Sequence, residues 1–361
     1  MIDVLVTGIG ICSAIGLNSE ENKNSLLESK SGIRKSNLLT SNFAKTHLFG
    51  EIKESNEDLK KELKLSGEGY TRTSLLAFKA FQESIESAGL DQTILSSNRT
   101  AFISATTVGG MSQTEQLNND ANIEESTSPF LDSYNFGSHT KEIAQFYNIK
   151  GITNTINTAC TSSLNSIAYG MNLIKMGKAD TAIVGGVDAL CKFTINGFNS
   201  MGILSTERCK PFSEDRTGLN LGEGAAYLVL ERSDSIKDKK VWAKVKSYGN
   251  TNDAFHQSSL SEEASGIVDS INECLAKANL RPQDIDYVNA HGTATENNDH
   301  SEQVAYNKIF GKDIEFSSTK GFTGHTLGAC GAIEAIFSIF SIQENTAFQN
   351  FSYSKKMEAF D

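Results

Sequence analysis

The sequence lacks the features that are typical of disordered, membrane-spanning and nucleic-acid-binding proteins. It has only 3 prolines in 361 residues and 39% hydrophobic residues, which is typical of a compact globular protein. No apolar run approaches about 18 residues, so no membrane span is expected, and the richest run, 329–342, carries Glu334. Acidic residues outnumber basic ones by 44 to 33, and the net charge of −11 argues against a nucleic-acid partner.

The start of the chain also lacks the pattern of a signal peptide. Asp3 interrupts the first apolar run, and the first strand is expected to end at Thr7 and Gly8. A cytoplasmic protein is therefore expected.

The cysteines show no paired spacing. There is no CxxC or HxxxH pattern, so neither a metal site nor a disulfide framework is expected, and free thiols are typical of a reducing cytosol. Five of the six are expected to be small packing residues. These five are Cys12, Cys191, Cys209, Cys274 and Cys330.

Short apolar runs alternate with longer amphipathic stretches, which predicts an α/β fold with buried strands. Amphipathic helices are expected over 74–88 and 267–278, and Gly89 and Asn279 suit left-handed caps at their ends. The expected strands are 4–6, 101–103, 152–157, 181–184, 226–230, 241–245, 287–288 and 314–318.

The order of these segments indicates an internal duplication. Each of the two helices leads through an acidic turn to a strand and then to a loop of small residues, 104–110 or 289–295. We therefore expect an amino-terminal half, 1–235, and a carboxyl-terminal half, 236–361, whose equivalent loops meet at one centre. The alternative is chance similarity between helix–turn–strand units.

Cys160 follows an expected strand and opens an expected helix. Its neighbours are small, and the helix N-terminus should favour its thiolate. The expected apolar stripe of the helix is Leu164, Ile167, Ala168, Met171 and Ile174. A lone cysteine is otherwise most often a buried structural residue. His291 and His325 favour a catalytic cysteine over a structural one, because both lie in glycine-containing loops that the duplication would bring to Cys160.

Several ordered motifs between residues 4 and about 342 resemble those of the elongating β-ketoacyl-ACP synthases. They are TACTSS at 158–163, PFSEDRTG at 211–218, GEGA at 222–225, HGTAT at 291–295, and STK at 318–320 followed by Gly324-His325. The resemblance implies a thiolase fold, with two duplicated βαβαβ halves in a five-layered α-β-α-β-α arrangement. It also implies a homodimer, or a heterodimer with a ketosynthase-like subunit.

The resemblance implies a decarboxylative condensation in fatty acid or in polyene or polyketide synthesis. Cys160 would take the acyl group from an acyl carrier protein (ACP), and His291 and His325 would stabilise the enolate of malonyl-ACP. Lys320, Asp299 and Glu302 match supporting residues that orient the histidines. No cofactor is implied beyond the 4′-phosphopantetheine that the carrier brings.

Residues outside the chemistry are assigned by the same resemblance and by charge. Val108 is expected in the acyl pocket, whereas Asp215, Arg216 and Glu223 resemble structural ion-pair residues. An acidic carrier needs a local group of cations on this acidic chain. The candidates are Lys60, Lys61 and Lys64 near Arg72, with Arg208 and Lys210 as a second group.

One motif of the family is absent. The family's Gly/Phe-rich loop, Asn-Ser-Phe-Gly-Phe-Gly-Gly, supplies a second oxyanion N–H, and this sequence stops at Asp361 before any such loop. We expect an incomplete carboxyl-terminal end, and the alternative is an inactive variant such as a chain-length factor. A degradative thiolase would need a second catalytic cysteine, which Cys330 fits poorly, and His325 argues against the initiating synthases.

Overall fold

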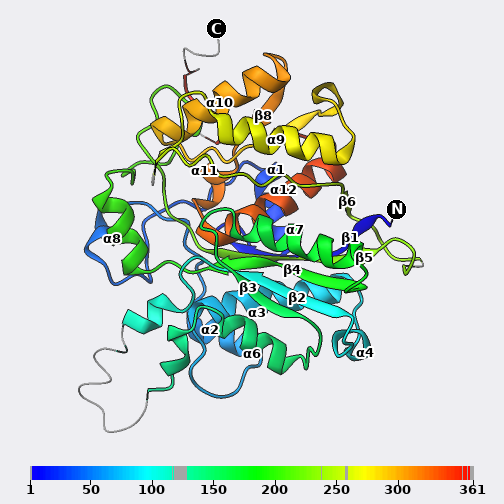
Figure 1. The fold of residues 1–361 in the computed structure, drawn as a ribbon. Helices are drawn as coiled ribbons and strands as arrows, with labels where there is room; N and C mark the ends of the chain where they lie inside the picture. The colour runs from blue at the N-terminus through cyan, green and yellow to red at the C-terminus, as the bar shows by residue number, and fades with distance from the viewer. Residues whose placement is uncertain are drawn as a thin grey trace.

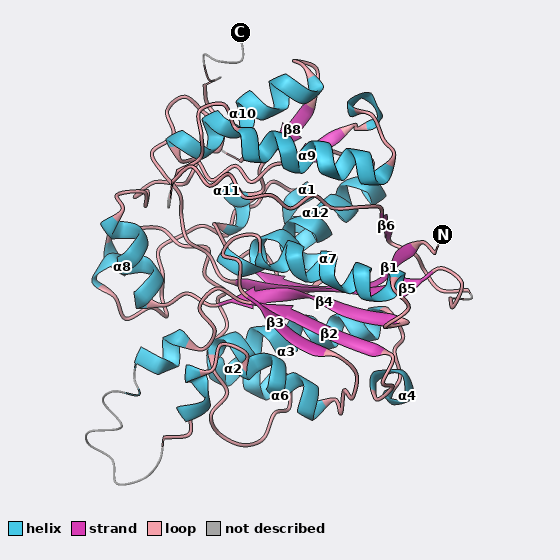
Figure 2. Ribbon diagram, in the orientation of Figure 1, coloured by secondary structure: helices cyan, strands magenta, loops and turns pink. Residues whose placement is uncertain are grey.

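A computed structural model describes residues 2–115, 117, 128–236, 238–256, 259–351, 353–355 and 357. Its strands form a six-stranded sheet in the order β3-β2-β4-β5-β1-β6 and a two-stranded sheet, β7-β8 (Figures 1 and 2). The strands are β1 (Val4–Ser13), β2 (Thr100–Ala105), β3 (Thr153–Ile156), β4 (Thr181–Asp188), β5 (Gly224–Arg232), β6 (Ala243–Val245), β7 (Tyr287–Asn289) and β8 (Glu315–Ser317).

Helices pack on both faces of the large sheet and around the small sheet (Figure 2). Helices α3 and α6 cover one face of the large sheet, α7 and α12 cover the other face, and α9 and α10 lie beyond the small sheet. The helices are α1 (Ser19–Leu27), α2 (Asn56–Glu62), α3 (Arg72–Ser87), α4 (Gln92–Leu95), α6 (Ser138–Phe146), α7 (Ser162–Lys175), α8 (Lys192–Ser200), α9 (Ser265–Ala278), α10 (Glu296–Phe310), α11 (Lys320–Thr323) and α12 (Cys330–Glu344).

Strand β1 runs further than its sequence indicates. It continues through an irregularity between Val6 and Gly8 and ends at Ser13, so the prediction of a strand end at Thr7 and Gly8 is wrong. Gly8 and Gly10 of β1 are needed for close packing instead. A Cβ on Gly8 would lie 2.4 Å from the carbonyl oxygen of Ser84 in α3. They allow α3 to approach the sheet closely.

Matching units recur in the two halves, as the sequence predicts. Helix α3 precedes β2 and α9 precedes β7, and their ends turn through left-handed residues, Gly89 (φ +62°) and Asn279 (φ +55°). Strand β2 pairs in parallel with β3, and β7 pairs in parallel with β8.

The halves are unequal in the described residues and are not packed as separate bodies. Strand β6 of the second half joins the large sheet beside β1, with Val245 opposite Val4. The largest apolar core contains residues from both sides of the predicted boundary, such as Ile11 and Phe340. The boundary at 235 stays a prediction.

One segment of the described residues, Leu327–Glu344, is long and apolar enough to cross a membrane by length and composition. However, 61% of it is buried inside the protein, where α12 packs against β5 and α7. It also carries Glu334, which pairs with a buried lysine. These are properties of a core helix.

Candidate active site

The turn that carries Cys160 connects β3 to α7. Ala159 adopts a left-handed conformation (φ +53°), and the hydroxyl of Ser162 closes the turn by accepting from Thr158 N (2.8 Å) and donating to Ala159 O (2.5 Å). Cys160 therefore lies two residues before α7 rather than at its first residue. Of the predicted apolar stripe, Leu164 is exposed, which contradicts the prediction, and the other members are buried.

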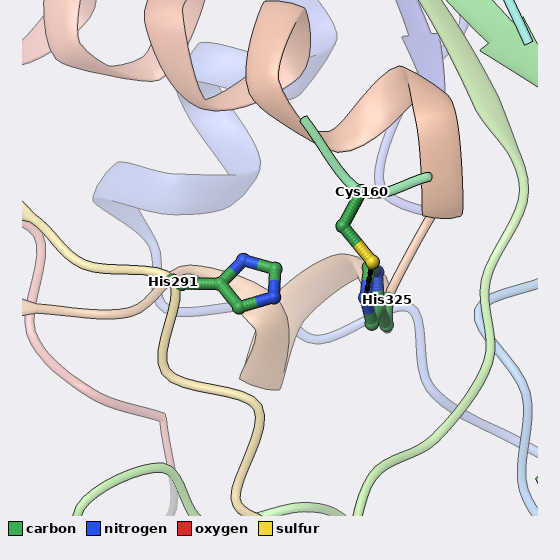
Figure 3. Close-up of side chains that lie close together, drawn as sticks. All are labelled: Cys160, His291 and His325. Carbon is green, nitrogen blue, oxygen red and sulfur yellow. Dashed lines mark hydrogen bonds between the residues drawn. The ribbon is translucent and has the colours of Figure 1, made fainter. Parts of the chain in front are cut away.

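His325 lies between α11 and α12 and faces the sulfur of Cys160. Its Nε2 is 3.1 Å from Sγ, and its Nδ1 accepts a hydrogen bond from Leu327 N at 3.1 Å (Figure 3). Because Nδ1 is occupied as an acceptor, the neutral ring carries its proton on Nε2. The ring is 2% exposed.

His291 follows β7 and approaches the sulfur from the second half of the chain (Figure 3). The ammonium of Lys320 lies 3.3 Å from its Nδ1, and an ammonium can only donate, so this ring also carries its proton on Nε2. The His291 and His325 rings meet edge to face with centroids 5.2 Å apart.

The sulfur and the two imidazoles form one cluster. One ligand-type atom from each of Cys160, His291 and His325 lies within 4.8 Å of the others. A metal ion would need lone pairs on the imidazole nitrogens, whereas the two rings direct Nε2–H groups at the sulfur. The arrangement suits an oxygen that develops negative charge.

Burial shifts the pKa values of this cluster toward the neutral forms of its groups. Burial raises the pKa of the Cys160 thiol to about 11, although the Lys320 charge opposes this. Burial and the same charge hold the pKa of both histidines well below their usual value. Burial therefore acts against the thiolate that the helix N-terminus is expected to favour, and which of the two prevails stays a prediction.

Lys320 is buried and holds His291 in place. Its Nζ donates to the carbonyl oxygen of His291 at 2.5 Å and pairs with Glu334 of α12. Burial opposes the charge of Lys320, but the Glu334 carboxylate outweighs this effect and raises its pKa. Sequence reasoning missed Glu334, although a lone carboxylate inside an apolar helix signals a buried partner.

Glu302 and Asp299, both in α10, support the His291 loop in different ways. Glu302 accepts from His291 N (2.7 Å) and Gly292 N (2.6 Å). Asp299 contacts neither histidine and instead accepts from Phe212 N (2.8 Å) and Ala294 N. Any effect of Asp299 on the histidines therefore passes through Ala294 in the loop that carries His291. Burial raises the pKa of Asp299 to about 6.

Val108 lies in the loop that follows β2, beside the nucleophile turn. It is 7% exposed, and its neighbour Thr107 accepts on its carbonyl oxygen from Asn157 Nδ2 (3.0 Å). The Thr107 hydroxyl also reaches Ala159 O at 3.5 Å. Val108 thus lies near the nucleophile turn, and its place in the acyl pocket stays a prediction.

Cys330 was expected to be a simple packing residue, but it lies against the nucleophile. It begins α12 and is 3% exposed, and its Sγ donates to the carbonyl oxygen of Cys160 at 3.2 Å. Burial raises its pKa well above the usual value. Burial and a raised pKa both favour an unreactive thiol at this position.

Comparison with known proteins decides the family. The family described as Beta-ketoacyl synthase, N-terminal domain, matches residues 1–235, and the corresponding C-terminal domain matches residues 242–354. The 3-oxoacyl-[acyl-carrier-protein] synthase 2 of Staphylococcus aureus (strain MRSA252) is 33% identical over 95% of this chain and 86% of its own length. The chain belongs to the β-ketoacyl synthase family.

Solved structures agree with this assignment. The ishigamide ketosynthase/chain length factor has a TM-score of 0.92 at 27% identity and covers 99% of this chain and 90% of its own. AntDE:AntF, a type II polyketide ketosynthase in complex with its acyl carrier protein, has a TM-score of 0.88 at 25% identity and covers 100% and 91%. The layered α/β architecture of the synthase is the thiolase fold, and the chain is a β-ketoacyl-ACP synthase-type acyltransferase.

One predicted docking cation of the synthase, Arg72, is not at the surface. Arg72 is buried, donates twice to Glu223 through Nε (3.0 and 2.9 Å) and once more through Nη2, and donates to Ile52 O. It is a structural ion pair, so its assignment to carrier docking is wrong.

The other predicted docking cations of the synthase reach the surface to different extents. Lys61 and Lys64 at the end of α2 are exposed, whereas Lys60 is half-buried and donates to Gly67 O. Arg208 is exposed and lies over the ring of Phe351, and Lys210 pairs with Asp215 at 2.6 Å.

Proposed function

We propose that this synthase performs a decarboxylative Claisen condensation. The Cys160 sulfur attacks the thioester carbon of an acyl-ACP, a new thioester forms, and the carrier leaves as its thiol with the Cys160 proton. Malonyl-ACP then loses CO₂, and the resulting enolate carbon attacks the acyl carbon. The C–S bond to Cys160 breaks, and β-ketoacyl-ACP leaves.

The observation that carries this proposal is the pair of Nε2–H groups beside the sulfur. The enolate oxygen needs hydrogen-bond donors that are oriented before the charge develops, and His291 and His325 are held in the donor tautomer by Lys320 and by Leu327 N. The chain needs no cofactor of its own for these steps, because the 4′-phosphopantetheine arrives on the carrier.

Intact-mass spectrometry with a panel of acyl-ACPs tests the proposal and reads the acyl length that the site accepts. We expect an acyl adduct on Cys160 and CO₂ release from malonyl-ACP. The absence of both would favour a non-catalytic partner of the chain-length-factor type, a kind of protein named in one of the similar structures. The intact cysteine and histidines argue for the enzyme, which would act in fatty acid or in polyketide or polyene synthesis in the cytoplasm.

We further propose that the synthase pairs with a second copy through the free edge of β3. The residues of β3 are exposed or half-buried, and a hollow of about 830 Å³ opens beside the strand, lined by Phe136, Thr155 and Asn157 among others. Ile152 and Phe136 are exposed apolar residues there. An open edge with apolar neighbours is unfavourable in a monomer.

Light scattering after gel filtration tests the dimer. Ile152→Asp with Phe136→Asp should produce a monomer, whereas Phe193→Asp on α8, also an exposed phenylalanine, should leave the dimer intact. A wild-type chain that is monomeric alone and dimeric only with a ketosynthase-like subunit would replace the homodimer with the heterodimer.

A further inference from the structure

The last residue of β4, Asp188, is a buried carboxylate that the proposed chemistry does not use. It is 0% exposed, and burial raises its pKa while its hydrogen bonds oppose this. Its charge is met by four donors: the Thr106 hydroxyl and the N–H groups of Thr107, Val108 and Gly328. These donors belong to two loops that are more than 200 residues apart in the sequence.

The two oxygens of Asp188 divide these donors between the loops. Oδ1 accepts from the Thr106 hydroxyl (2.6 Å) and Val108 N (3.1 Å) on the acyl-pocket side. Oδ2 accepts from Gly328 N at 2.7 Å on the histidine side, and Thr107 N is shared between the oxygens. Each oxygen therefore holds one loop.

The bond to Gly328 acts on the residue that sets the His325 tautomer. Leu327 adopts a left-handed conformation (φ +50°), which a leucine adopts only when its surroundings impose it, and its N–H donates to His325 Nδ1. The direction of the Gly328 N–H depends on the backbone torsion of Leu327. Asp188 also approaches so closely that a Cβ on Gly328 would lie 2.8 Å from Oδ2.

We propose that Asp188 is a positioning residue: it holds the 327–328 turn in the conformation that keeps His325 as an Nε2–H donor, and it ties this turn to the acyl-pocket loop. The carboxylate acts through the backbone and touches neither the substrate nor the sulfur. The proposal deepens the proposed function, but its first readout, the tautomer, does not depend on that function.

Asp188→Asn should distinguish the hydrogen bonds to the acyl-pocket loop from the hydrogen bond to the 327–328 turn. The amide oxygen of an asparagine keeps more hydrogen bonds when it takes the Oδ1 position, which has more donors. Its NH₂ group then faces the Gly328 N–H, and because both groups are donors, no hydrogen bond forms between them. We expect the variant to keep the hydrogen bonds to the acyl-pocket loop and to lose the hydrogen bond that holds the 327–328 turn. Thr106→Val does the reverse, because it removes a donor to Oδ1 and leaves the Gly328 bond.

Ring ¹⁵N NMR of histidine-labelled enzyme reads the tautomer directly. We expect one Nε2–H signature for His325 in the wild type, its loss in Asp188→Asn, and its retention in Thr106→Val. Malonyl-ACP decarboxylation should fall about 10²-fold in Asp188→Asn, with the KM for acyl-ACP little changed, because a small misplacement of a catalytic group has effects of this size.

Asp180→Asn is the matched control. Asp180 immediately precedes the same strand at its opposite end and pairs with Arg99 and Arg232 at the surface, so its loss should leave both the tautomer and decarboxylation unchanged. If Asp188→Asn does not fold, Gly328→Ala carries the same test, because its Cβ would lie 2.8 Å from Asp188 Oδ2 and 2.9 Å from Thr107 N and would separate the turn from the carboxylate and the loop it binds.

A folded Asp188→Asn or Gly328→Ala variant that retains the wild-type tautomer overturns the proposal. A wild type that shows the Nε2–H tautomer but no acyl adduct and no decarboxylation would contradict the proposed function instead, and the tautomer would still test Asp188.

Discussion

The two halves of the synthase bring different kinds of structure to the same site. The first half presents Cys160 on a turn at the edge of the six-stranded sheet, and small residues and backbone bonds hold it. The second half presents His291 from a two-stranded sheet, and buried charges hold it: Glu302 on the backbone and Lys320 with Glu334 behind the ring. The nucleophile is thus positioned by the hydrogen bonds of a tight turn and the first histidine by buried charged side chains.

His325 differs from His291 although both present the same group. Backbone amides set its orientation and tautomer, through Leu327 N and the turn that Asp188 holds. The difference teaches that equivalent donors can depend on unrelated parts of the structure. Substitution of Lys320 or Glu302 should disturb His291, whereas changes to the 327–328 turn or to Asp188 should disturb His325.

The largest expected effect is the loss of acyl transfer when the Cys160 thiol of the first half is removed. Cys160→Ala should abolish the acyl adduct with acyl-ACP, because Cys160 groups with both imidazoles, whereas Cys330, which groups with His291 and Glu334, is buried and has its pKa raised well above the usual value. Cys160→Gln should also lose acyl transfer but keep malonyl-ACP decarboxylation, since the histidine half is untouched. Intact mass and CO₂ release measure the two steps, and an adduct that persists in Cys160→Ala would place the nucleophile elsewhere.

The reverse substitutions remove the donors of the second half. His291→Ala and His325→Ala should each lower decarboxylation by about 10²–10³-fold, the usual cost of one oxyanion donor. Acyl transfer to Cys160 should fall less. Single-turnover acylation and steady-state CO₂ release compare the steps, and normal condensation by either variant contradicts the donor assignment.

Removing Lys320 tests whether buried charge is what positions His291. Lys320→Met leaves Glu334 unpaired and should lower the free energy of unfolding by about 3–5 kcal/mol. Lys320→Met with Glu334→Leu should recover much of that stability, because neither charge remains, but not the decarboxylation rate. Denaturant unfolding and CO₂ release measure the two effects. A double variant with normal activity would show that the ion pair serves stability alone.

The pH dependence of thiol alkylation tests the neutral resting state of the cluster. Because the pKa of Cys160 is raised to about 11, its thiol is protonated at neutral pH, and its rate with iodoacetamide should rise about tenfold per pH unit up to that value. Peptide mapping separates Cys160 from Cys274, which is also partly exposed. A rate that levels off near pH 7 would indicate a resting thiolate.

The smallest expected effect concerns the surface of the first half. Lys61→Glu with Lys64→Glu should raise the KM for acyl-ACP several-fold and flatten its salt dependence, with little change in kcat, because rim charges act mainly on encounter. Acyl-CoA should react as before. Lys175→Glu with Lys178→Glu, an exposed pair on the same chain, is the matched control. An equal effect on both substrates or in both variants would exclude this patch as the docking site.

Most of the site could be predicted because its motifs are local. The turn around Cys160, the loops that carry His291 and His325, and the residues Lys320 and Glu302 are all contiguous with recognisable motifs. Asp188, Glu334 and the burial of Arg72 could not be predicted in this way, because each depends on a partner far along the chain. The length of β1 was underestimated because its glycines resemble a turn unless the packing of α3 is known.

The sequence by itself determined the order of strands, helices and reactive loops, the left-handed caps at Gly89 and Asn279, and the family. These follow from local conformational preference and from motifs that need no knowledge of contacts. Only the tertiary structure decided the electrostatics of the site: burial favours a neutral Cys160 thiol, hydrogen bonds favour two Nε2–H imidazoles, and Glu334 favours a charged Lys320. The physical reason is that burial and Coulomb interactions add up over groups brought together from distant parts of the chain.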